Sequence, residues 1–195
     1  ETFFWSIAGV AEMRRTDDSG VVARRLISQA QRNDPVRLQR VIDSIRLGLA
    51  TYQWGMDWDI PTLITNCEKA GLYGVELRTS LNYAHGVELT LGASQRAAVK
   101  QRFADSPVHL VSIACSERLD WPEPDKLRAA IEASKTHLQL SHDIGCDVLR
   151  VFPNQFHRDV PRERTIEQIA RALDELGAVA ADLGQEVSLE AHGPA

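Results

Sequence analysis

The sequence predicts an α/β fold in which strands and helices alternate to build one parallel sheet. From Arg46 onward, short apolar stretches alternate with longer stretches of helical periodicity. Glycines stand just past three of the helical stretches, at Gly71, Gly145 and Gly184, where helices commonly end. Successive strands are roughly 27 to 40 residues apart, which leaves room for the crossover helix that joins parallel strands.

The elements follow in a regular order. We expect Asp59, followed by Ile60-Pro61, to cap a first helix, and Ser94 to cap a second. Asp125 and Glu163 open two longer helices. The expected strands are 47–53, 73–78, 108–115, 147–152 and 186–192, and the expected helices are 60–70, 94–105, 125–144 and 163–183.

Two parallel architectures compete for this pattern. A doubly wound sheet usually carries a glycine-rich phosphate loop after its first strand, and residues 53–57 (Gln-Trp-Gly-Met-Asp) do not match GxGxxG. A (β/α)8 TIM barrel places reactive side chains at the carboxyl ends of several strands, which is where Glu76, Arg78, Arg150 and Glu190 fall. The barrel is therefore favoured. A complete barrel takes about 250 residues, so we expect this chain to hold an incomplete one of about five strands.

Residues 1–42 differ from the rest. They hold an apolar start at 3–8, a polar turn, a helical stretch at 21–30, and Asp34-Pro35 opening a helix toward Ile42. We expect an N-terminal extension at 1–42 and the partial barrel at 43–195.

Composition narrows the function classes. The net charge of −5 gives no basic footprint for nucleic acid, and no apolar run approaches the ~18 residues of a membrane span. Three widely spaced cysteines, without a CxxC, predict reduced and buried thiols. A cytoplasmic location is expected, with export left open because the chain begins at Glu1. A homo-oligomer is possible because strands one and five would leave open edges.

The stretch from Glu186 to Ala195 carries the strongest chemical signal. Val187, Leu189 and Ala191 alternate with Ser188, Glu190 and His192, the period of a strand with one apolar and one reactive face. A carboxylate and an imidazole on one face at the tip of a strand are a start for a divalent metal site.

Other side chains of the expected barrel interior are candidates for the substrate pocket. An inward Arg150 must meet a carboxylate or a substrate anion, because burying it unpaired is prohibitive. Glu76 and Arg78 share a face, where a structural salt bridge and a substrate contact are both open. Trp54 could form an apolar wall against a sugar ring, or merely pack. Among the histidines, His109 is expected in the core. Four others lie on expected loops or helix faces and are expected at the surface: His85, His137, His142 and His157.

Three stretches together resemble the xylose-isomerase-like TIM barrels. They are residues 72–78 (Leu-Tyr-Gly-Val-Glu-Leu-Arg), 146–152 (Cys-Asp-Val-Leu-Arg-Val-Phe) and 187–193 (Val-Ser-Leu-Glu-Ala-His-Gly), which resemble strands two, four and five of that superfamily. The resemblance covers about residues 45–195. It implies a divalent-metal-dependent barrel that binds Mn, Mg, Co or Zn, in which Glu190 is the first metal ligand. The family's remaining ligands would lie beyond Ala195.

The resemblance also implies an activity. In isomerase and epimerase members the metal-bound glutamates move the proton next to a carbonyl, so Glu190 is both the catalytic and the metal candidate, with His192, Arg150, Glu76 and Trp54 as substrate-binding candidates. We expect an isomerase or epimerase of a small carbohydrate (a sugar, sugar phosphate or polyol), inactive in this chain alone. The alternatives are a polyol dehydratase or lyase and a non-catalytic sugar-binding or assembly barrel. Endonuclease IV relatives use several early histidines, and this acidic chain offers only His109 there.

Overall fold

The computed structural model of the chain describes residues 4–6 and 46–190. These residues form strands and helices that alternate from Arg46 to Leu189. The strands are β1 (Phe4–Ser6), β2 (Arg46–Ala50), β3 (Gly74–Arg78), β4 (His109–Arg118), β5 (Val148–Phe152) and β6 (Glu186–Leu189). The helices are α4 (Ile60–Lys69), α5 (Ala93–Ala104), α6 (Pro124–Asp143) and α7 (Arg162–Asp182).

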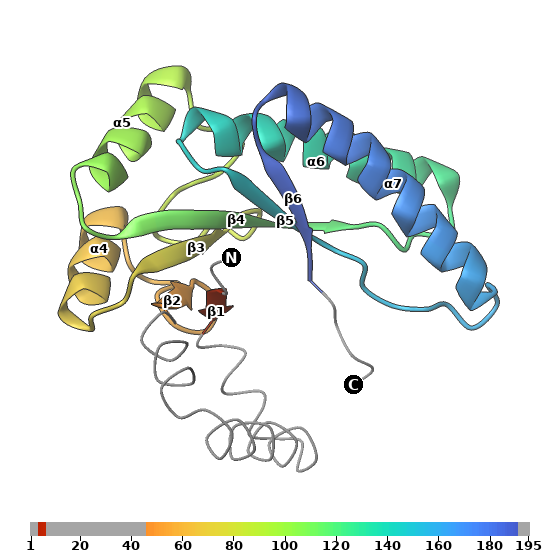
Figure 1. Cartoon of the computed structure of the whole chain (residues 1–195), viewed down its shortest axis with the longest axis horizontal. Coiled ribbons are helices and arrows are strands. Elements are labelled where there is room, and N and C mark those ends of the chain that lie inside the picture. Colours follow the sequence, from red (N-terminus) through yellow and green to blue (C-terminus); the bar gives the residue numbers. More distant parts are fainter. Residues whose placement is uncertain (1–3, 7–45, 191–195) are drawn as a thin grey trace, which may run out of the picture.

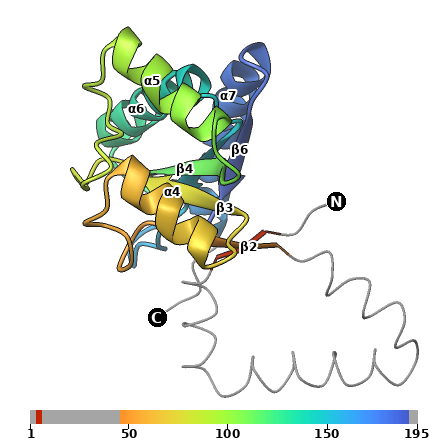
Figure 2. The same cartoon turned by 90° about the vertical axis from the view of Figure 1, so that its left-hand side faces the viewer.

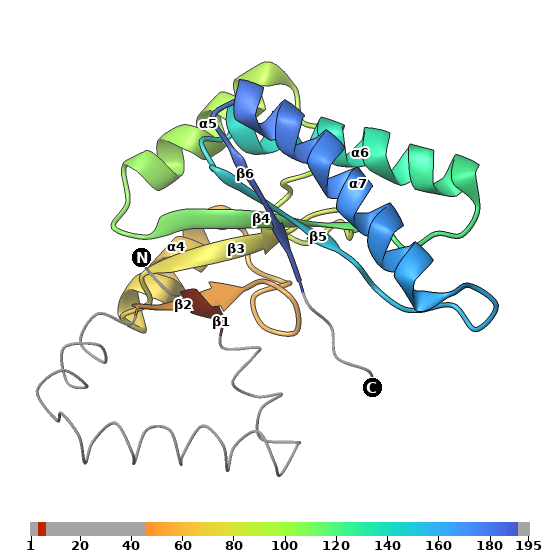
Figure 3. The ribbon, with the colours of Figure 1, turned by 45° about the vertical axis from the view of Figure 1, so that its right-hand side comes forward.

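The sheet is parallel throughout, and its strands lie in chain order from β1 to β6. Helices α5, α6 and α7 lie along one side of the sheet (Figures 1 and 3), and the side view shows α4 on the same flank as α5 (Figure 2). A doubly wound sheet reverses its strand order and carries helices on both faces. Sequential order with the helices on one side is the arrangement of a barrel wall, so the prediction of an incomplete (β/α) barrel is confirmed.

The hydrophobic core lies between the sheet and the helices. Leu77, Leu149 and Val151 are fully buried, and they alternate along their strands with Glu76, Arg78 and Arg150. Because successive strand residues point to opposite faces, the apolar side chains pack against the helices while the charged ones face the other side of the sheet. The same burial accounts for the cysteines, which are all free and buried, as predicted.

Helix starts follow their local chemistry, with one correction. Asp59 caps α4 as predicted, since its Oδ1 accepts a hydrogen bond from the Thr62 backbone N–H at 2.9 Å. Ser94 is not the cap of α5, because Gly92 holds that position and the Gln95 side chain accepts from its N–H at 2.9 Å. By residue type alone, serine is a stronger N-cap than glycine. The sequence pattern therefore favoured Ser94 over Gly92. Strand β4 also continues three residues past its predicted end at Cys115.

Strand β1 pairs in parallel with β2, placing Phe4 opposite Arg46 and Ser6 opposite Gly48. The expectation that the first barrel strand leaves an open edge is therefore wrong, because β1 occupies that edge. Of the expected N-terminal extension, only residues 4–6 are described, and the helices predicted at 21–30 and 35–42 lie outside the described residues. The division at residue 42 stays a prediction.

No helix within the described ranges has the length and apolar character needed to cross a membrane.

Candidate functional site

Three charged side chains meet on the face of the sheet opposite the core. Arg150 of β5 donates to Glu76 of β3 through Nε at 2.9 Å and through Nη2 at 2.6 Å. The Arg150 guanidinium also forms an ion pair with Glu190 through Nη1. The hydroxyl of Ser112 donates to Glu76 Oε2 at 2.7 Å. Arg150 thus joins two carboxylates that are far apart in the sequence.

Strand register brings these residues together. Arg78 aligns with Ala114, Ala114 with Arg150, and Arg150 with Ser188, so one row crosses four strands. Glu190 stands two residues beyond Ser188 on the same face, and its backbone N–H donates to the Val151 carbonyl at 3.1 Å. The ladder therefore holds Glu190 one residue past the end of β6. The carboxylate sits at the carboxyl edge of the sheet, the edge at which barrel enzymes place their reactive groups.

Glu76 is the more buried of the two carboxylates, with 10% of its side chain exposed against 34% for Glu190. The bidentate contact from a guanidinium is the strongest common way to hold a buried carboxylate. Both Glu76 oxygens accept hydrogen bonds, so this side chain is fixed in place. Glu190 is the more accessible group for chemistry with a ligand.

The predicted candidates Trp54 and His192 are placed differently. Trp54 follows β2 and forms an isolated parallel bridge with Thr51, and 69% of the residue is exposed. The exposed indole ring is available for stacking. Within the part of the chain that the structure describes, no aromatic ring or cation contacts it. His192 lies outside the described residues. Its role, like that of Trp54, stays a prediction.

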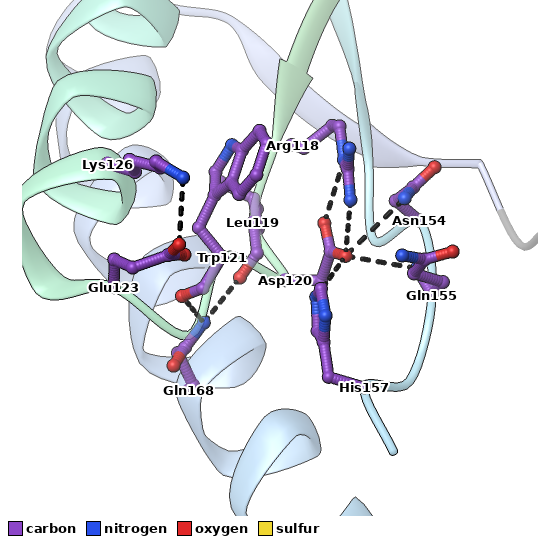
Figure 4. Close-up of polar contacts among 10 residues, drawn as sticks. All are labelled: Arg118, Leu119, Asp120, Trp121, Glu123, Lys126, Asn154, Gln155, His157 and Gln168. Carbon is purple, nitrogen blue, oxygen red and sulfur yellow. Dashed lines mark hydrogen bonds and ion pairs between the residues drawn. The ribbon is translucent and has the colours of Figure 1, made fainter. Parts of the chain in front are cut away.

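A second polar cluster joins the loops after β4 and β5 (Figure 4). The Asp120 side chain is completely buried and accepts from Arg118 at 3.2 and 2.8 Å, from His157 Nε2 at 2.9 Å, and from the Gln155 backbone N–H at 3.4 Å. Burial alone would raise the pKa of Asp120, but hydrogen bonds from Arg118, Asn154 and His157 outweigh it and keep that pKa below its usual value. The cluster ties the two loops together.

Sequence reasoning missed Asp120, which falls between the expected strand 108–115 and the expected helix 125–144 and was not singled out. A signal was present, because the loop after a barrel strand lies at the reactive edge. Asp120 is in such a loop, five residues past the expected strand end at Cys115 and two past the observed end at Arg118. His157 was expected at the surface, and it is instead partly buried because its ring reaches Asp120.

Three other histidines also correct the prediction. His85 and His137 are buried rather than at the surface. His85 accepts from the Val87 backbone N–H at 3.0 Å, and its other ring nitrogen bonds the Arg78 carbonyl at 3.1 Å. His109, expected in the core, is exposed and stacks on Tyr73 with ring centroids 4.3 Å apart. His109 begins β4 rather than lying inside it, so alternation counted from Val111 could not predict its burial.

The loop after β3 is held by a carboxylate of its own. Glu88 accepts hydrogen bonds from the backbone N–H groups of Ser80, Leu81 and Asn82 at 2.7, 3.2 and 2.8 Å. Ser80 and Asn82 have positive φ values of 70° and 52°. That conformation turns successive N–H groups toward one point and makes an anion-binding nest, which Glu88 fills.

The described residues do not by themselves make a metal centre. No three His, Cys, Asp or Glu side chains of this part of the chain converge as a metal shell requires. Glu190 supplies one carboxylate, and Arg150 already pairs with it. Glu190 can serve as one ligand only where other residues complete the set.

The sheet is parallel and its strands lie in chain order, with helices on one side and charged side chains at its carboxyl edge. This arrangement defines the chain as part of a TIM barrel. The sequence profile of the xylose isomerase-like TIM barrel family matches residues 64–195. The chain belongs to that family, as the resemblance implied. A second profile, of a protein family of unknown function (DUF3509), matches residues 10–60. No curated protein matches the chain in sequence.

Solved structures share the fold. The IOLI protein with a bound zinc atom matches with a TM-score of 0.63 and 14% identity, covering 74% of this chain and 51% of that protein. D-psicose 3-epimerase with D-tagatose, from Clostridium cellulolyticum H10, gives 0.61 and 16%, covering 74% and 52%. AsbF from Bacillus anthracis, described as the probable 3-DHS dehydratase, gives 0.58 and 15%, covering 76% and 53%. The chain spans about half the length of each of these proteins.

Proposed function

We propose that the protein is a metal-dependent isomerase or epimerase of a small carbohydrate, acting by removal of the proton next to a carbonyl. The observation that carries this proposal is the position of Glu190. Its carboxylate stands at the carboxyl edge of a barrel wall, partly accessible, and is oriented by Arg150. The fold relatives titled as epimerases support the same reaction class.

Glu190 is the better candidate for the base. A carboxylate that moves a proton must reach the substrate and change its hydrogen bonds during the reaction. Both oxygens of Glu76 are engaged by Ser112 and Arg150, which leaves that side chain as a support. Glu190 takes the proton from the carbon beside the carbonyl. Its return to a neighbouring carbon gives an isomer, and its replacement on the opposite face gives an epimer.

Arg150 orients the base in this proposal. Its contacts with Glu76 fix the guanidinium, and the remaining nitrogen holds Glu190. His192 and Trp54 are proposed to contact the sugar. A divalent cation would polarise the substrate carbonyl, with Glu190 as one ligand and the other ligands supplied by residues outside the described ranges.

A dehydratase is the second candidate, because the fold is shared with AsbF, described as a probable dehydratase. Its reaction begins with the same proton abstraction and then releases water. Product analysis separates the two, since only the dehydratase yields a product lighter by one water. A non-catalytic sugar-binding barrel would instead bind sugar in the presence of a chelator and show no turnover.

The test compares Glu190→Gln with Glu186→Gln in the complete protein. The two glutamates lie at opposite ends of β6, and Glu186 is exposed at the start of the strand. Exchange of the substrate's α-hydrogen for solvent deuterium, followed by NMR over a panel of ketoses and aldoses, reports the abstraction step directly. We expect Glu190→Gln to abolish exchange and weaken metal binding, and Glu186→Gln to leave both unchanged. Unchanged exchange in Glu190→Gln would contradict the proposal.

A further inference from the structure

Among the described residues, Arg78, at the carboxyl end of β3, is a partly buried cation without an ion pair to a carboxylate. Four arginines of the described residues are partly buried, namely Arg78, Arg96, Arg118 and Arg150. Three of them bind carboxylates: Arg96 pairs with Asp143, Arg118 with Asp120, and Arg150 with Glu76. Arg78 has no such ion pair within residues 46–190, and its Nε is buried without a hydrogen-bond partner.

Aromatic rings hold the guanidinium instead. Its central carbon lies 5.2 Å from the centroid of Tyr52 and 4.8 Å from that of Phe152. The Arg150 guanidinium lies 5.1 Å from the same Phe152 ring. Two positive groups therefore lie against one aromatic side chain, and within the described residues only Arg150 of the two forms ion pairs with carboxylates. Burial, together with the charge of Arg150, keeps the pKa of Arg78 below its usual value.

An unsatisfied guanidinium is costly to bury, and its planar fork of donors matches the oxygens of a carboxylate or a phosphate. Arg78 stands in the same row of the sheet as Arg150, two residues from Glu76 on the same face. A group bound there would lie along the edge that carries Glu190.

We propose that Arg78 binds an oxyanion of the substrate, so that the protein acts on an acidic sugar derivative, a sugar phosphate or a sugar acid, and not on a neutral sugar. This inference rests on the proposed function, because it places the substrate at the edge that holds Glu190. It adds a specificity-determining residue and narrows the substrate class.

Calorimetric titration of the protein with three probes on one skeleton tests the proposal: glucose 6-phosphate, glucuronate and glucose, all in the presence of a chelator. We expect at least one anion to bind more tightly than glucose. Arg78→Met should weaken that binding about 10- to 100-fold, the usual contribution of hydrogen bonds to a charged group. Arg78→Lys keeps the positive charge but lacks the planar set of donors of a guanidinium. Its affinity for the anion should fall between those of the wild type and Arg78→Met.

Arg171→Met is the matched control. Arg171 is an exposed arginine of α7 that pairs with Glu167 one helical turn away, so its loss should leave anion binding unchanged. Arg78→Met keeps an apolar stem against the two rings and removes an uncompensated charge, so we expect it to fold, which circular dichroism checks. Preference for glucose 6-phosphate identifies a phosphate site, and preference for glucuronate a carboxylate site.

Equal binding of glucose and both anions would overturn the inference, as would anion binding that Arg78→Met leaves intact. These outcomes differ from a failure of the proposed function. If the anion binds through Arg78 while the protein never exchanges an α-hydrogen, the inference stands and the isomerase proposal falls. Glu190→Gln should abolish exchange yet retain anion binding.

Discussion

Arg150 donates two hydrogen bonds, at 2.9 and 2.6 Å, to the carboxylate of Glu76, which lies 74 residues earlier in the sequence. Removing the guanidinium in Arg150→Met leaves Glu76 buried and without its counter-charge. We expect the free energy of unfolding, measured with urea, to fall by about 3–5 kcal/mol. The matched double variant Glu76→Gln/Arg150→Met should lose less than Arg150→Met alone, because it leaves no buried charge at that position. A loss in the double variant that equals the sum of the losses of Glu76→Gln and Arg150→Met, each measured alone, would show that the pair is not coupled.

Stability should decline as the pH falls from about 7 to about 5. Burial lowers the pKa of both His85 and His137, while hydrogen bonds to backbone carbonyls and the charge of Glu88 act in the opposite direction. Because the folded-state pKa lies below that of the unfolded chain, the unfolded state binds more protons below about pH 6.5. The contribution of these two histidines to the free energy of unfolding is therefore fully present above that pH and is lost as the pH falls below it.

The variant His137→Gln should flatten this pH dependence, whatever it does to stability at neutral pH. His142→Gln is its control, since the His142 side chain is half exposed near the end of the same helix. Urea unfolding at several pH values gives the slopes. A wild-type slope that persists in His137→Gln would exclude this histidine as a source.

Asp120→Asn should loosen the two loops of the second polar cluster. The carboxylate accepts charged hydrogen bonds from Arg118 and His157, and hydrogen bonds to charged groups contribute about 1.5–3 kcal/mol each. We expect a loss of about that size at neutral pH, with faster amide exchange at residues 154–157. The folded-state pKa is lowered, so the wild-type advantage should be lost as the pH falls below about 4. Asp159→Asn, at an exposed position in the same loop, should change neither quantity.

Two glycine substitutions should act in opposite directions. A Cβ at Gly74 would lie 2.5 Å from Val111 Cγ2 and 2.6 Å from the His109 carbonyl oxygen, so Gly74→Ala forces β3 and β4 apart. We expect a loss of about 1–3 kcal/mol. In α7, Gly177 has no atom within 4 Å of such a Cβ, and Gly177→Ala should gain about 0.5–1 kcal/mol from helix propensity. Thermal unfolding distinguishes the two, and a stabilised Gly74→Ala would contradict the close packing described.

The alternation of strands and helices was readable because its signals are local. Asp59 and Gly71 bound a helix through their own backbone chemistry, and the buried pattern of Leu149 and Val151 reports a strand directly. The pairing of β1 with β2 was not readable, since residues 4–6 are too few to show a strand period. Likewise, Gly92 can cap α5 because the Gln95 side chain reaches back to its N–H group. The residue preference at a single position does not reveal this contact.

The site was predictable in part. Alternation put Glu76, Arg78 and Arg150 on one face, and the need to neutralise Arg150 predicted a carboxylate partner; the structure supplies both Glu76 and Glu190. Glu76 is fixed and Glu190 is accessible because of the strand register and the hydrogen bond from Ser112. Neither feature can be predicted from the residues next to each glutamate in the sequence. Asp120 and His157 lie 37 residues apart and meet only because β4 and β5 are neighbours. Local patterns cannot measure such distances.

The pairing of β1 with β2 affects how two copies of this sheet could associate. In the described sheet β1 covers the edge of β2, and the outermost strands are β1 and β6. β1 has only three residues, Phe4–Ser6, whereas β2 has five, Arg46–Ala50. A very short edge strand offers few backbone N–H and C=O groups to another chain, which is one way in which proteins limit edge-to-edge association. The short strand at the start of the chain therefore leaves a shorter template for pairing on that side of the sheet than β2 would.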